Sequence, residues 1–233
     1  MADNSEIVKR AVKNIIDTYN NLFYYKEELG KIIHSPIKNT RDQIYDNFNS
    51  IERAIKDGNI NLLKGSLEQI KTLSNKLFGL IGNAVTTANK AVYSNLKELT
   101  NYFPDAREHI INVAKNVMAR NVDYSNRVKG ALNNFNTAVT NFENAINSGK
   151  YGNFNAVMQS FLRVDYILLD VEVYIIRCFE NELKKAIQEK VSNKDYLKIF
   201  EGERKKLLAE KAKIIKEDKS LLGKIKKRVS ELF

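Results

Sequence analysis

Apolar side chains return at every third or fourth residue along nearly the whole chain of 233 residues. This spacing places them on one face of an α-helix, whereas a half-buried strand needs alternation with period two. No stretch of the sequence alternates in that way for long. Ten glycines and two prolines also leave little turn chemistry for many short strands. We therefore expect an all-α fold.

Turn signals divide the chain into helical segments. Pro36 cannot donate a backbone hydrogen bond and disfavours helix in the residue before it. Asp57-Gly58 is a typical helix end, Pro104 suits the first turn of a helix, and residues 148–152 form the clearest turn. Gly79 and Gly82 suggest a bend or a close helix approach, and Gly202 a break or fraying. The expected helices cover residues 4–34, 37–57, 63–103, 104–147, 154–187 and, from a cap at 192–193, the rest of the chain to 233.

Long helices with short connections favour antiparallel side-by-side packing. We predict an elongated antiparallel bundle of four to five long helices over residues 1–191, followed by a basic amphipathic helix over residues 192–233. A weak internal similarity relates residues 37–100 to residues 128–191. Each half reads as a helix, a glycine turn and a longer helix, so a duplication of this hairpin is one interpretation.

Motifs of familiar enzyme classes are missing from the sequence. It has no glycine-rich phosphate loop, no Gly-x-Ser-x-Gly and no Cys-x-x-Cys. Neither His34 nor His109 completes the Glu-x-x-His pattern of a di-iron bundle. The single cysteine, Cys178, reads as a small buried hydrophobe. We expect a protein without catalytic residues, metal, cofactor or small-molecule substrate.

Two carboxylates interrupt the apolar stripe of the fifth segment. Asp165 and Glu172 are seven residues apart and so share one helix face, in what should be the most buried helix. Buried carboxylates need partners, and three cations lie on apolar stripes elsewhere. We interpret the two acids as a buried polar pair that fixes helix register. The alternatives are a ligand or metal pocket inside the bundle, which could form the site of an enzyme, and a stripe that faces solvent. The candidate partners are Lys26, Arg41 and Arg120.

The positive charge of the protein is concentrated near its C-terminus. Of the net charge of +10, residues 184–233 supply +8, with 16 Lys or Arg and 8 Asp or Glu, while the rest of the chain supplies +2. Such asymmetry indicates contact with an anionic partner. The candidate anionic-surface residues are Arg204, Lys205, Lys206, Lys211, Lys213, Lys224, Lys226, Lys227 and Arg228.

Four interpretations of this C-terminal helix remain open. It packs on the bundle with a solvated lysine face, associates with another copy as a coiled coil, lies on an anionic membrane surface, or contacts nucleic-acid phosphates without reading sequence. No aromatic residue is interleaved with the lysines of residues 203–228, which disfavours stacking on bases.

The sequence therefore predicts a non-enzymatic structural or interaction protein, with a protein partner or a second copy bound through its basic end. A sequence-nonspecific nucleic-acid or membrane-surface binder, acting through residues 203–233, is the alternative. No secretory signal is visible, so we expect a cytoplasmic protein. Abundant Asn, Lys, Ile and Tyr fit an AT-rich genome, as of a virus or plasmid.

Overall fold

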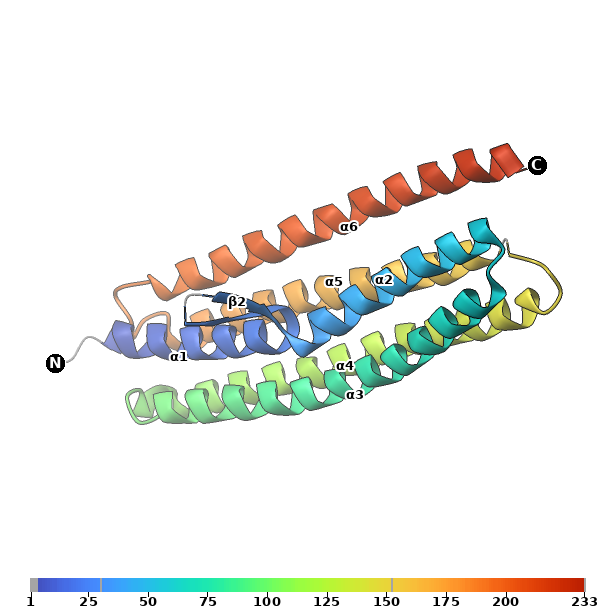
Figure 1. Cartoon of the computed structure of the whole chain (residues 1–233). Helices are drawn as coiled ribbons and strands as arrows, with labels where there is room; N and C mark the ends of the chain where they lie inside the picture. The colour runs from blue at the N-terminus through green and yellow to red at the C-terminus, as the bar shows by residue number, and fades with distance from the viewer. Residues whose placement is uncertain (1–3, 30, 152, 233) are drawn as a thin grey trace. The chain divides into compact units, whose positions relative to one another are not determined.

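The computed structural model describes residues 4–29, 31–151 and 153–232, and the side chains of these except 25–28, 31, 32 and 217–232. The all-α prediction is confirmed. In chain order the elements are α1 (Asn4–Tyr19), the π-helix η1 (Asn20–Tyr24), β1 (Tyr25–Glu28), β2 (Lys31–His34), α2 (Pro36–Asp57), α3 (Ile60–Leu99), the 3₁₀-helix η2 (Pro104–Ala106), α4 (Arg107–Ile146), α5 (Phe154–Ile187) and α6 (Tyr196–Leu232) (Figure 1).

The turns between the long helices follow from local chemistry. Gly58 ends α2 with φ +63° and Gly149 follows α4 with φ +69°, a left-handed conformation that costs glycine no steric strain. Pro104 opens η2 at a position where its missing N–H costs nothing. The ends of α2 and α4 thus share a left-handed glycine, while a duplication of the two hairpins stays a prediction.

A β-hairpin replaces the end of the first expected helix, so the prediction of a continuous helix to residue 34 is wrong. β1 pairs with β2 in antiparallel register, with Glu28 opposite Lys31, which leaves a two-residue turn. Leu29 in this turn has φ +51°. The apolar spacing at Leu29 and Ile33 looked helical, yet both side chains are exposed. Stripe positions that face solvent give a helix no burial energy, so the hairpin prevails here.

The C-terminal helix is also more regular than expected. α6 runs without a break from Tyr196 to Leu232, so the prediction of a break or fraying near Gly202 is wrong. One glycine costs a helix only about 1 kcal/mol relative to alanine. Buried residues on both sides of Gly202, Phe200 and Leu207, hold the helix on its neighbours.

The chain forms two compact units. Unit 1 comprises Met1–Asn39, Leu80–Asn126 and Val171–Leu208; unit 2 comprises Thr40–Gly79, Arg127–Asp170 and Ala209–Phe233. The helices α3, α4, α5 and α6 therefore each contribute residues to both units. The predicted boundary between residues 191 and 192 stays a prediction.

Each unit contains packed helices that run antiparallel. In unit 1, Arg10 and Asn14 of α1 contact Glu98 and Asn95 of α3 in reverse order. In unit 2, Arg41 and Phe48 of α2 contact Asp165 and Phe154 of α5 in reverse order. Among the described residues, no helix has an apolar stretch long enough to cross a lipid bilayer.

Candidate functional site

Asp165 is the centre of a buried polar cluster in unit 2. The Asp165 side chain is 1% exposed, and its two carboxylate oxygens accept hydrogen bonds from different residues of α2. Arg41 Nε donates to Oδ1 at 2.5 Å and the Tyr45 hydroxyl donates to Oδ2 at 2.7 Å. A buried carboxylate is tolerated only with partners of this kind. Arg41, one of the three cations proposed as partners, thus reaches Asp165.

Burial and the neighbouring negative charge shift the pKa of Arg41 in opposite directions. Burial works against its positive charge, but the adjacent Asp165 carboxylate outweighs burial and raises the pKa of the guanidinium. The pair is thus ionic, and it joins α2 to α5 at one register. The two opposite charges neutralise each other across the contact between α2 and α5.

Glu172 lies in a different setting, in unit 1. Its side chain is buried, and its charge acts on Tyr19 of α1 and on Lys206 of α6. The Tyr19 hydroxyl donates to Asn121 Oδ1 at 2.5 Å, and Asn121 Nδ2 donates to Asn89 Oδ1 at 2.8 Å. Burial raises the pKa of Tyr19, so its hydroxyl stays protonated and a donor. Asp165 and Glu172 therefore each have their own partners.

Lys206 connects α6 to the buried polar side chains of unit 1. Its ammonium donates to Asn20 Oδ1 and to Glu203 Oε1, and it lies 4.3 Å from the centre of the Tyr24 ring. Asn20 Nδ2 in turn donates to Glu203 at 3.3 Å. Burial lowers the pKa of Lys206, although the carboxylates of Glu203 and Glu172 oppose this effect. The π-helix η1 supplies Asn20 and Tyr24, and so forms the socket for a lysine of α6.

The four other basic candidates of α6 whose side chains the structure describes are also paired with acids. Lys211 binds Asp170 at 2.5 Å and lies over the Tyr166 ring. Burial opposes its charge, but hydrogen bonds to Asp170 and Tyr166 raise its pKa overall. Three further ion pairs are Arg204 with Glu180, Lys205 with Glu201 and Lys213 with Glu210.

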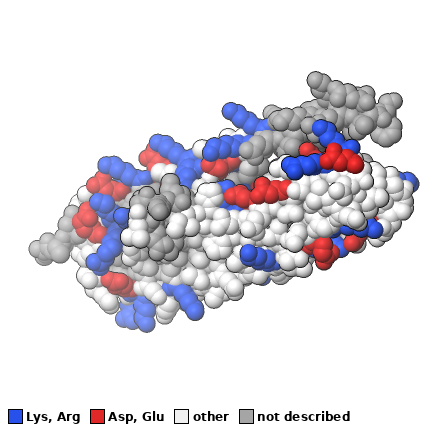
Figure 2. Space-filling model, viewed as in Figure 1, with Lys and Arg blue, Asp and Glu red and all other residues white. Residues whose placement is uncertain are grey.

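The remaining basic candidates lie outside the described side chains: Lys224, Lys226, Lys227 and Arg228. On the face that Figure 2 shows, basic and acidic side chains are mixed, and much of the rest of the described surface carries neither. The described part of α6 thus buries Phe200, Leu207 and Ile214. Arg204 and Lys211 pair with acids of α5, whereas Lys205 and Lys213 pair with acids of α6 itself. This matches the first of the four interpretations for that part alone.

The sequence pattern predicted Asp165, Glu172 and Arg41 as buried polar residues or their partners, but not the other polar side chains described above. The spacing of Tyr19 from the other apolar residues of the first helical segment predicts a buried ring but gives no partner for its hydroxyl, and nothing in the sequence marks Asn20, Asn89 and Asn121. Their signal was weak, because asparagine is common throughout this chain. Arg120, a proposed partner, lies instead over the exposed ring of Tyr174, and the side chain of Lys26 in β1 is outside the described set.

The hydrogen bonds and ion pairs described above connect different helices within each unit. Among the described residues, no group of three or more His, Cys, Asp or Glu side chains is placed to bind a metal ion. Comparison of the chain with protein-family models, with curated proteins and with solved structures found no match.

Proposed function

We propose that the protein is a non-enzymatic interaction protein, in which a helical bundle presents the basic end of α6 to an acidic surface of a protein partner or of a second copy. The observation that carries the proposal is the pairing of basic side chains along α6. Arg204, Lys205, Lys206, Lys211 and Lys213 each have an acidic partner within the chain.

The sequence beyond these pairs has a different charge balance. Residues 219–229 contain five Lys or Arg and no acid in the sequence of the segment itself, in contrast to residues 201–213, where acids alternate with the cations. It also continues the apolar spacing of α6 with Leu221, Leu222 and Ile225. A helix that combines basic and apolar side chains suits a partner with an acidic rim around an apolar groove.

The same composition favours one other target, an anionic membrane surface. Basic amphipathic helices bind at the lipid interface with their apolar face buried among the headgroups. The leucine pair at 221–222 within a lysine-rich segment favours lipid over nucleic acid, because no aromatic side chain is available to stack on bases.

A pair of matched variants tests the proposal. Lys226→Ala/Lys227→Ala removes two charges from the proposed binding segment, and Lys205→Ala/Lys213→Ala removes two from the neutralised part of the same helix. Self-association would be followed by analytical ultracentrifugation, and binding to poly-glutamate, phosphatidylserine vesicles and duplex DNA by titration, each at low and high salt.

We expect self-association or poly-glutamate binding that weakens with salt and is lost in the 226/227 variant but kept in the 205/213 variant. Binding confined to vesicles, with the same dependence on the variants, would replace the first proposal with the second. Equal behaviour of both variants in every assay would reject both.

A further inference from the structure

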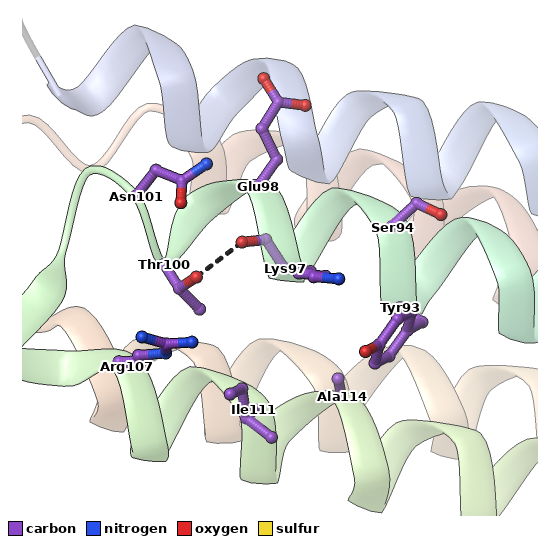
Figure 3. A pocket seen from close by; sticks show the side chains of 9 residues that line it. All are labelled: Tyr93, Ser94, Lys97, Glu98, Thr100, Asn101, Arg107, Ile111 and Ala114. Atoms are coloured by element: carbon purple, nitrogen blue, oxygen red, sulfur yellow. Dashed lines mark hydrogen bonds between the residues drawn. The ribbon is translucent and has the colours of Figure 1, made fainter.

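An open groove in unit 1 combines positive charge with an apolar floor. It lies between the C-terminal turns of α3 and the N-terminal turns of α4 and has a volume of about 660 Å³, within the usual size of small-molecule sites. Lys97 and Tyr93 border it from α3, and Arg107 and Ile111 from α4, as Figure 3 shows. The remaining lining residues are Ser94, Glu98, Thr100, Asn101 and Ala114.

The charges in this groove are unbalanced. Glu98 is the acid of the lining, and it is held by Arg10 of α1 at 3.0 Å. The Arg107 side chain makes no hydrogen bond or ion pair with any residue that the structure describes. The Lys97 ammonium lies 5.7 Å from the centre of the Tyr93 ring, without an acidic partner in that same part of the chain. Two cations therefore face the groove without a counter-charge.

The helix end beside the groove does not supply that counter-charge. The carbonyl oxygen of Lys97 accepts from the Thr100 hydroxyl at 2.7 Å and from its backbone N–H, and the carbonyl of Glu98 accepts from the N–H of Asn101. These carbonyls, which would otherwise attract the two cations, are already satisfied. The lysine and arginine are thus available to an outside anion.

The shape of the lining restricts the class of anion. Ile111, the buried Ala114 and the half-exposed Tyr93 ring give an apolar surface between the charged groups. A guanidinium and an ammonium together suit a phosphate group, which accepts several charge-assisted hydrogen bonds at once. We propose that this groove binds a small organic phosphate monoester, with the phosphate held by Lys97 and Arg107 and an aromatic or apolar body against Tyr93 and Ile111.

Phenyl phosphate is a suitable probe, compared with inorganic phosphate, benzoate and phenol. Binding would be measured by calorimetry and by amide chemical shifts. The variants are Lys97→Ala and Arg107→Ala, with Lys115→Ala as the control, because Lys115 is exposed on α4 but does not line the groove. The substituted side chains are all exposed, so circular dichroism should show the same fold for each variant.

We expect saturable binding of phenyl phosphate, weakened about tenfold by each groove variant, the usual effect of losing one charge-assisted hydrogen bond, and unchanged in Lys115→Ala. Shifts should be confined to residues 93–114. Inorganic phosphate should bind less tightly, since it lacks the apolar body. The proposal fails if phenyl phosphate does not saturate, if Lys115→Ala weakens binding as much as the groove variants, or if benzoate binds as tightly as phenyl phosphate.

Discussion

Leu29 occupies the turn of the β-hairpin in a conformation that suits it poorly. Its φ of +51° lies in the left-handed region, and its side chain is 98% exposed. A left-handed conformation costs a residue with a Cβ roughly 1–2 kcal/mol, and no burial compensates it here. Because Gly30 follows, an asparagine at position 29 would create Asn-Gly, the preferred pair for a two-residue hairpin turn.

We therefore predict that Leu29→Asn raises the free energy of unfolding by about 1 kcal/mol. Chemical denaturation followed by circular dichroism measures this change. Leu29→Ala is the matched control, because it removes the exposed apolar side chain but keeps the backbone cost, and it should leave stability nearly unchanged. A gain for alanine as large as for asparagine would assign the effect to side-chain exposure.

The Arg41–Asp165 pair allows a second prediction for single residues. Asp165→Asn leaves the Arg41 guanidinium buried without its paired carboxylate, and breaking one partner of a buried ion pair costs about 3–5 kcal/mol. Asp46→Asn on the exposed face of α2 should change stability by less than about 0.5 kcal/mol. Urea unfolding of both variants checks the contrast; a similar, small loss in both would show that the pair contributes little.

The polar residues also show how far sequence reasoning reaches at this scale. The position of Asp165 and Glu172 on an apolar stripe was enough to predict that both are buried, as the structure has them. Their partners were not predictable with the same certainty, because Arg41 and Asp165 are 124 residues apart in the chain. Only the packing of α2 on α5 brings them together, and three cations satisfied the pattern equally well.

At the scale of the helices, glycine has different roles inside a helix and at its end. Gly79 lies inside α3, and a Cβ added there would meet no atom within 4 Å, so no neighbouring helix approaches it closely. Gly58 ends α2 with φ +63°, where a side chain is strained. The same substitution should therefore have opposite effects at the two positions.

We predict that Gly79→Ala stabilises the protein by about 0.5–1 kcal/mol, through lower backbone entropy of the unfolded chain, and that Gly58→Ala destabilises it by about 1–2 kcal/mol. Melting temperatures from calorimetry give the two signs. Destabilisation by Gly79→Ala would mean that α3 needs its glycine for another reason, such as a bend.

The positions of the helices were predictable where the apolar stripe is buried, and the prediction was wrong where the stripe is exposed. The runs at Leu63–Leu99 and Ile110–Ile146 supply buried residues at nearly every expected stripe position, which is why α3 and α4 extend over 40 residues each. The stripe at Leu29 and Ile33 has the same spacing, but both side chains are exposed. Periodicity states which face a helix would bury, whereas the fold decides whether anything packs there.

At the scale of the whole molecule, the two units are joined by continuous helices. α3, α4 and α5 each pass from one unit into the other without a break. Unfolding half of such a helix leaves unsatisfied backbone groups at the new end and costs helix cooperativity. The units should therefore lose their structure together.

Phe200→Ala in unit 1 tests this coupling. Phe200 is fully buried and packs edge-on against Phe179, so its truncation should cost about 3–5 kcal/mol. If the shared helices couple the units, hydrogen exchange should accelerate by a similar factor in the buried part of α4 in unit 1, residues 110–125, and in its continuation in unit 2, residues 131–146. Leu208→Ala, on an exposed position of the same helix, should change neither. Faster exchange confined to residues 110–125 would show instead that the helices can fray at the boundary, and that each unit is stable on its own core.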